Sequence, residues 1–137
     1  MRTINKIIIH CSATKEGQNV TTTDIDRWHK QRGFAKIGYH YVIYLDGTVH
    51  KGRDIAEIGA HCTGQNANSI GICYIGGLDA AGTPKDTRTK AQKEALAKLV
   101  GELKQKFPES TINGHNEFAN KACPCFDVGN WAKENNL

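Results

Sequence analysis

The apolar run Ile7-Ile8-Ile9, which starts after Lys6 and ends at His10, constrains the fold more than any other feature of the sequence. Consecutive β-branched residues without polar alternation are typical of a strand that is buried on both faces. Such strands belong to parallel or mixed sheets that are covered by helices. The run therefore predicts a buried strand over residues 6–10 of an α/β domain.

The rest of the chain alternates between strand-like and helix-like segments. Further strands are expected at residues 39–45, 48–51, 69–75 and 111–115. Between the first two of these, Asp46-Gly47 is the signal for a two-residue hairpin. In that hairpin, Tyr39 and His40 point to opposite faces, and His50 lies on the face of Tyr39.

Three helices are expected. Thr21 or Thr23 caps the first, which ends near Arg32 before Gly33. The longest runs from about Lys90 to Lys106 behind a Thr89/Gln92 capping box. Asp127 caps the last, with Phe126 and Trp131 as a hydrophobic staple. The order predicts an α/β domain whose mixed central β-sheet has about five strands and is flanked by about three helices.

Size and composition exclude several classes of protein. The chain has 137 residues, which fits a single domain spanning 1–137. No apolar run is long enough to cross a bilayer, and none near the N-terminus resembles a signal peptide. The net charge is +4, but the basic residues are scattered, so no nucleic-acid partner is expected. Nothing in the sequence demands an oligomer, and a monomer is expected.

Two histidines and a cysteine occupy positions that suit a metal site. His10 and His115 end two of the expected strands, where the chain opens into loops. Cys123 follows His115 by eight residues, on a loop that can fold back over the strand end. Together they would hold Zn²⁺ by three ligands and leave one position open, as in catalytic zinc sites. The alternatives are that these residues are structural, or that other histidines are the ligands: His29, His40, His50 and His61.

Other chemistries fit the sequence less well. The chain has no G-x-S-x-G segment and no phosphate-binding loop. Gly76 and Gly77 follow a strand but open no helix, which excludes a dinucleotide-binding motif. The five cysteines are an odd number in a chain without a visible signal, which argues against a disulfide framework. Cys11 is expected to be a packed thiol.

Several separate segments, in matching order, resemble one enzyme family. They are His10-Cys11-Ser12-Ala13-Thr14, Gly38-Tyr39-His40-Tyr41, Asp46-Gly47-Thr48-Val49, Gly52-Arg53-Asp54, Asn68-Ser69-Ile70-Gly71-Ile72, Gly76-Gly77 and Lys121-Ala122-Cys123-Pro124. In these segments the chain is similar to the zinc N-acetylmuramoyl-L-alanine amidases, the family that includes peptidoglycan recognition proteins and phage lysozymes. The resemblance covers residues 6–131.

This resemblance implies a reaction and assigns roles. The reaction is hydrolysis of the amide between N-acetylmuramic acid and L-alanine in peptidoglycan, by a zinc-activated water that attacks the lactyl carbonyl. His10, His115 and Cys123 match the family's zinc ligands, and Tyr39 and Lys121 match its catalytic residues. A lysine ammonium can stabilise the oxyanion, while the tyrosine phenol can orient the water or relay a proton.

The resemblance also suggests where the substrate binds. The polar loop before the strand at 69–75 is expected to line a groove for muropeptide through its side chains, or else to be solvated; these residues are His61, Thr63, Asn66 and Asn68. Arg53 is free to pair with a peptide carboxylate, or with Asp54 or Glu57 at the surface. Trp28 and Trp131 are assigned to the core.

Three alternatives to the amidase remain open. The first is a peptidoglycan-binding module that does not cut, and the second is a polymerase-regulating protein with secondary amidase activity. The short segment before the first strand argues against the second. The third is a zinc peptidase that cleaves a cross-link amide. For the amidase, we expect cytoplasmic synthesis without a signal peptide and action on the cell wall after release, as for an endolysin.

Overall fold

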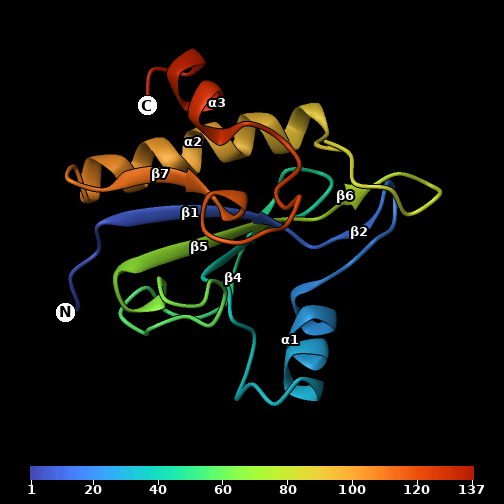
Figure 1. The fold of residues 1–137 in the computed structure, drawn as a ribbon, viewed down its shortest axis with the longest axis horizontal. Helices are drawn as coiled ribbons and strands as arrows, with labels where there is room; N and C mark the ends of the chain where they lie inside the picture. The colour runs from blue at the N-terminus through green and yellow to red at the C-terminus, as the bar shows by residue number, and fades with distance from the viewer.

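A five-stranded mixed sheet forms the centre of the structure, which is a computed structural model and describes all 137 residues (Figure 1). Its strands are β1 (Lys6–Cys11), β3 (Tyr41–Ile43), β4 (Val49–Lys51), β5 (Ser69–Tyr74) and β7 (Thr111–Gly114). The helices are α1 (Thr22–Gln31), α2 (Lys90–Lys106) and α3 (Val128–Glu134). Two-residue strands β2 (Thr14–Lys15) and β6 (Gly77–Leu78) pair separately, and single 3₁₀ turns form η1 (Asn66–Asn68) and η2 (His115–Glu117). The expected mixed sheet with three helices is confirmed.

The strand order β4-β3-β5-β1-β7 places β1 between two later strands. It pairs in parallel with β5 on one side and β7 on the other. Only the β3–β4 hairpin is antiparallel. Because β1, β5 and β7 run in the same direction, their carboxyl ends lie at one edge of the sheet, where α/β proteins build ligand sites.

The two faces of the sheet are covered differently. Ile7 and Ile9 of β1 belong to a large apolar cluster with Leu96 of α2 and Trp131 of α3. In Figure 1, α2 and α3 lie on one side of the sheet, and α1 lies on the other. Since side chains alternate along a strand, His10 points to the face opposite Ile9, away from α2 and α3. On the carboxyl edge of the sheet, His10 therefore faces the side of α1.

Helix α1 is fixed at its start and on one face. Thr21 forms a capping box with Asp24, which makes Thr21, rather than Thr23, the cap. Ile25 is buried in a second apolar cluster with Val42 of β3 and Ile75, against which Trp28 packs. This packing holds the end of α1 beside the carboxyl edge of the sheet.

The register of the β3–β4 hairpin differs from the expected one. Ile43 pairs with Val49, and the Tyr44 N–H donates to the Thr48 carbonyl, so the loop has three residues instead of two. Gly47, at φ +85°, takes the left-handed position that such three-residue loops require. One extra residue shifts the pairing by one and turns side chains to the other face. His50 is therefore opposite Val42 instead of Ile43, and its ring stacks on Tyr44. Because Tyr39 and Tyr44 pack against the apolar cluster that contains Val42, His50 still lies on the same side of the sheet as Tyr39.

Two strands are also shorter than expected at the ends that carry Tyr39 and His115. Regular pairing in β3 begins at Tyr41, so Tyr39 lies just before the strand, although its carbonyl still accepts from the Arg53 N–H. Strand β7 ends at Gly114, and His115 opens the η2 turn. Tyr39 and His115 therefore lie outside the regular strand pairing, at the edge of the sheet where the pocket forms.

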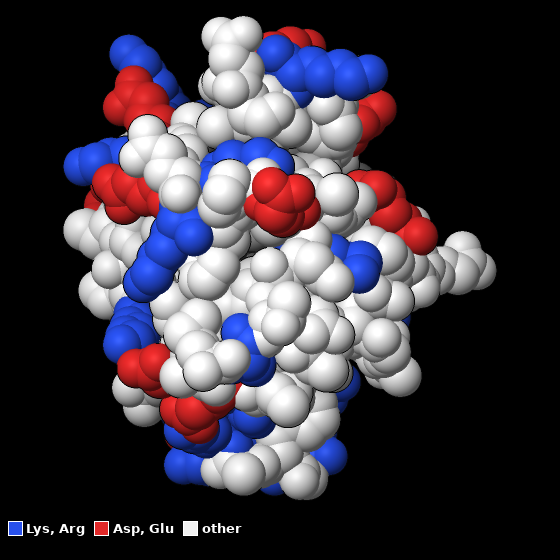
Figure 2. All heavy atoms as spheres, turned by 90° about the vertical axis from the view of Figure 1, so that its left-hand side faces the viewer, with Lys and Arg blue, Asp and Glu red and all other residues white.

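The surface shows no single-sign region on the face drawn in Figure 2, where Lys and Arg alternate with Asp and Glu. Six ion pairs join opposite charges, and most of these are exposed. No helix is long and apolar enough to span a membrane.

Candidate active site

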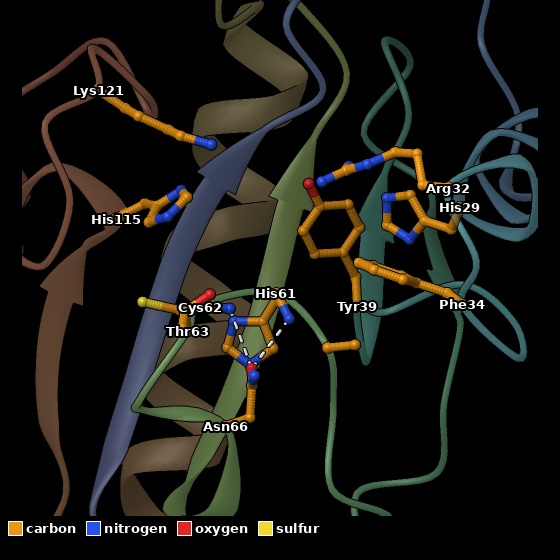
Figure 3. Close-up of a pocket in the computed structure, with 11 residues that line it drawn as sticks. His29, Arg32, Phe34, Tyr39, His61, Cys62, Thr63, Asn66, His115 and Lys121 are labelled. Atoms are coloured by element: carbon orange, nitrogen blue, oxygen red, sulfur yellow. Dashed lines mark hydrogen bonds between the residues drawn. The ribbon is translucent and has the colours of Figure 1, made fainter.

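A pocket of about 300 Å³ opens at the carboxyl edge of the sheet. Figure 3 shows its side chains in front of β1 and β5, with α2 behind the sheet. They come from segments far apart in the sequence: the end of α1, the segment before β3, the loop before β5, and the loop after β7. The pocket thus lies on the open face to which His10 points.

His10, His115 and Cys123 converge beside this pocket, which His115 lines. Their potential ligand atoms all lie within 4.8 Å of one another. The Nδ1 atoms of His10 and His115 are 3.2 Å apart. The adjacent, parallel pairing of β1 with β7 brings the two imidazoles together, as expected from their positions at strand ends. No other histidine belongs to this group.

The thiol of Cys123 is held by the backbone of β1. Its Sγ accepts a hydrogen bond of 3.1 Å from the Cys11 N–H, which stabilises negative charge on sulfur. Cys11 itself is buried, as expected for a packed thiol. Cys125 turns away from this contact: its Sγ donates to the Gly77 carbonyl at 3.3 Å. All five cysteines are free, in agreement with the absence of a disulfide framework.

Tyr39 and Lys121 lie on either side of the histidines. The Tyr39 ring centroid is 5.2 Å from that of His10 and 5.3 Å from that of His29. Lys121 is exposed on the loop before Cys123, and Figure 3 shows its side chain reaching into the pocket above His115. Both residues line the pocket.

The electrostatics of the pocket favour neutral imidazoles and anionic ligands. Burial lowers the pKa of His61 to about 3, and burial is also the largest cause of the lowered pKa values of His10 and His115. Burial raises the pKa of Tyr39, so its hydroxyl stays protonated. Arg32 and Lys121 line the pocket, whereas no carboxylate does.

These shifts predict how the metal-free protein responds to acid. A histidine in the unfolded chain has a pKa near 6.5, whereas burial lowers the pKa of His61 in the folded protein to about 3. The free energy of unfolding should therefore fall as pH drops below 6.5, by up to about 1.4 kcal/mol per pH unit for each such histidine. The test is to measure the urea midpoint of unfolding between pH 7 and pH 5 in the presence of a chelator. In this range histidines change protonation, whereas most carboxyl groups titrate at lower pH. The slope should be shallower in His61→Asn, and a midpoint that does not change with pH would contradict the prediction.

The residues proposed to line the groove do not all reach it. His61, Thr63 and Asn66 line the pocket, whereas the Asn68 side chain donates to the Thr3 carbonyl at 2.8 Å and does not. The Asn66 Oδ1 atom accepts from the main-chain N–H groups of both His61 and Cys62, as the dashed lines in Figure 3 show. This pair of bonds fixes the loop that carries His61.

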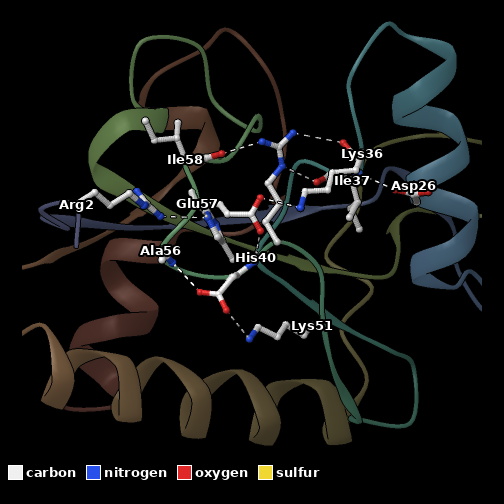
Figure 4. A network of polar contacts seen from close by, with 11 residues as sticks. Arg2, Asp26, Lys36, Ile37, His40, Lys51, Ala56, Glu57 and Ile58 are labelled. Atoms are coloured by element: carbon white, nitrogen blue, oxygen red, sulfur yellow. Dashed lines mark hydrogen bonds and ion pairs between the residues drawn. The ribbon is translucent and has the colours of Figure 1, made fainter.

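Arg53 and His40 have structural roles outside the pocket; Figure 4 labels His40 and the three residues whose carbonyls bind Arg53. Arg53 pairs with neither Asp54 nor Glu57: its guanidinium donates to three backbone carbonyls, on Lys36, Ile37 and Ile58. Buried His40 accepts from the Gly71 N–H through Nδ1 and donates from Nε2 to the Glu57 carbonyl. These bonds tie the segment after β4 to the rest of the fold.

Sequence reasoning missed one wall of the pocket. His29, Arg32 and Phe34 line it from the end of α1 and the turn that follows. His29 accepts from the Gly38 N–H through Nδ1 at 2.8 Å, which couples α1 to the backbone beside Tyr39. The helical pattern of α1 places His29 on the buried face but does not show that this face ends at a pocket.

Comparison with known proteins gives a consistent result. The family model described as N-acetylmuramoyl-L-alanine amidase matches residues 1–126. The endolysin of Escherichia phage T7 is 44% identical over 131 residues, covering 96% of this chain and 87% of the phage protein. The N-acetylmuramoyl-L-alanine amidase LysC of Clostridium intestinale has a similar structure, with a TM-score of 0.85 at 29% identity, over 99% of this chain and 87% of that one.

A third relative has been solved with a ligand. It is the ectodomain complex of peptidoglycan recognition proteins LCa and LCx bound to tracheal cytotoxin, which matches with a TM-score of 0.77 at 26% identity. The match covers 98% of this chain and 83% of that chain. The sequence motifs, the five-stranded sheet and the convergence of His10, His115 and Cys123 agree with these likenesses. The chain belongs to the N-acetylmuramoyl-L-alanine amidase family, whose phage members include endolysins.

Proposed function

We propose that this protein hydrolyses the amide bond between N-acetylmuramic acid and L-alanine in peptidoglycan, with a zinc ion held by His10, His115 and Cys123. The observation that carries the proposal is the convergence of these three ligand atoms within 4.8 Å beside the pocket that His115, Tyr39 and Lys121 line. The cell wall is then the place of action, as for the endolysins to which the chain is related.

The residues present fit a zinc ion. Tetrahedral zinc with nitrogen and sulfur ligands separates its ligand atoms by roughly 3.3–3.7 Å. The 3.2 Å between the Nδ1 atoms of His10 and His115 is close to this value. Two neutral imidazoles and one thiolate form a donor set typical of zinc, and three protein ligands leave a position open, as catalytic sites require.

When bound there, zinc supplies Lewis acidity, which polarises a carbonyl and lowers the pKa of water towards neutrality. The protein supplies the remaining groups. The Lys121 ammonium stabilises the negative charge that develops on the lactyl carbonyl oxygen. Because its pKa is raised by burial, the Tyr39 phenol acts as a hydrogen-bond donor that orients water or relays a proton, and not as a base.

The polar wall formed by the loop before β5 supports muropeptide binding. The Thr63 hydroxyl is exposed, and the Asn66 amide nitrogen has no hydrogen-bond partner within the protein. Arg32 and Lys121 provide positive charge for the carboxylates of a stem peptide. The related recognition proteins bound to tracheal cytotoxin support the choice of ligand class.

Digestion of purified peptidoglycan, read by mass spectrometry of the products, tests the proposal. The expected products are stem peptides with a free L-alanine amino terminus, and a chelator should stop their release until Zn²⁺ is restored. Retention on the wall without cleavage would support a recognition module instead. Products cut at a cross-link amide would indicate a zinc peptidase.

The role of Tyr39 can be separated from metal binding. We expect Tyr39→Phe to retain its zinc but to lose about 10²-fold or more in kcat, because the hydroxyl that orients water or relays a proton is gone. Tyr41→Phe is the matched control, since Tyr41 packs against the apolar cluster and does not line the pocket. Equal turnover in Tyr39→Phe and in the unaltered protein would remove Tyr39 from the mechanism.

A further inference from the structure

Three buried or partly buried side chains form a continuous chain of polar contacts behind the metal site. His10 Nε2 is 2.8 Å from His61 Nδ1, and His61 Nε2 is 3.2 Å from Ser69 Oγ. His10 is 1% exposed and Ser69 is fully buried, so neither exchanges its partner for bulk water. The contact with His61 uses Nε2 of His10, whereas Nδ1 of the same ring faces His115.

Only two arrangements of protons satisfy this chain. In the first, His10 Nε2–H donates to His61 Nδ1, and His61 Nε2–H donates to Ser69 Oγ. In the second, every bond is reversed, and the remaining proton of neutral His10 sits on Nδ1. A protonated Nδ1 has no lone pair for a metal, so only the first arrangement leaves His10 able to bind zinc.

The surroundings of His61 hold its ring in one place. A Cβ atom built on Gly71 would lie 2.6 Å from ring carbons of His61, and one on Gly59 would lie 2.8 Å from its Cδ2. The two glycines thus leave just enough space for the imidazole. Asn66 fixes the backbone on the other side by accepting the N–H groups of His61 and Cys62. An imidazole packed in this way is positioned to meet His10 and has both nitrogens engaged.

We propose that His61 is a positioning residue, which selects the tautomer of His10 that presents Nδ1 to the metal. The proposal rests on the function proposed above, because it takes His10 as a zinc ligand. Accepting the Nε2–H of His10 also orients the His10 ring, as outer partners do for metal-binding histidines in general. His61 then contributes to hydrolysis through His10, while Thr63 and Asn66 remain the substrate-facing residues of this wall.

The tautomer can be measured directly in the metal-free protein. Long-range ¹H–¹⁵N correlations of the imidazole rings should show the His10 proton on Nε2 in the unaltered protein. A proton on Nδ1 of His10 would overturn the proposal whatever the variants do. In His61→Leu, the His10 ring should show a mixture of the two tautomers, because its partner has been removed.

Zinc affinity, measured by competition with a chromophoric chelator, provides the second readout. His61→Leu should bind Zn²⁺ about 10- to 100-fold more weakly, the range found when the outer partner of a ligand is removed. His61→Asn should recover most of the affinity, since its side-chain oxygen can accept from His10 where Nδ1 does. The control is His50→Leu, the same exchange at a ring that stacks on Tyr44 outside the pocket, and its affinity should be unchanged.

The outcomes separate this proposal from the proposed function. If the unaltered protein binds no zinc, both fail. If it binds zinc and His61→Leu binds equally tightly while hydrolysis is lost, the amidase assignment stands and the positioning role is wrong. If His61→Leu does not fold, the tautomer of the unaltered protein and the affinity of His61→Asn decide the question.

Discussion

Cys123→Ser is expected to lose tightly bound zinc and to reduce hydrolysis by about 10³-fold or more. A serine hydroxyl does not ionise near neutral pH, so the site loses its one anionic ligand and its softest donor. The Lewis acidity that depends on this ligand contributes several kcal/mol to transition-state stabilisation, and each 1.36 kcal/mol is a factor of ten in rate. Metal content by mass spectrometry and turnover on peptidoglycan measure the two effects together.

Cys125→Ser is the matched control, because it makes the same exchange two residues away. The Cys125 thiol lies against the Gly77 carbonyl and does not belong to the three-ligand group. Its zinc content and turnover should remain close to those of the unaltered protein. Normal metal content and full activity in Cys123→Ser would show that Cys123 is not a ligand.

Lys121→Ala is expected to keep its zinc and to lose about 10²- to 10³-fold in kcat, the typical cost of removing one oxyanion donor. The side chain is exposed on its loop and reaches into the pocket beside His115, so its loss should not disturb the fold. The measurement is single-turnover cleavage of a soluble muropeptide at saturating zinc.

Lys85→Ala serves as the comparison for lost positive charge. Lys85 forms an exposed ion pair with Glu16 away from the pocket, and such pairs contribute at most about 1 kcal/mol to stability. Its turnover should be unchanged. If Lys121→Ala turned over as fast as Lys85→Ala, Lys121 would have no part in the reaction.

Local patterns predict the parts of this structure whose energetics are local or repetitive. The buried strand β1 and the capping box of α2 form as expected, because each depends on residues that are neighbours in the sequence. The meeting of His10 and His115 also follows from a general rule, since parallel strands end at the same edge of a sheet.

Local patterns do not predict contacts between residues that lie far apart in the sequence. The hairpin register depends on one additional loop residue before Gly47, which the Asp46-Gly47 signal does not specify. The three carbonyls that bind Arg53 come together only in the folded chain, and so do His10 and His61. Composition and spacing place these residues in the right loops but do not select their partners.

The central position of β1 in the sheet has a consequence for synthesis of the protein. The ribosome makes β1 first, yet this strand pairs only with β5 and β7, and His10 is separated from His115 by 105 residues. At translation rates of about 5–20 residues per second, the second histidine follows the first by roughly 5–20 seconds. Four of the five strands have been made by Tyr74, whereas β7 and the other two residues of the proposed metal site follow only after Lys106. The pairing of β1 with β7 and the proposed metal site can therefore form only late in synthesis, after the segment that follows α2 has been made.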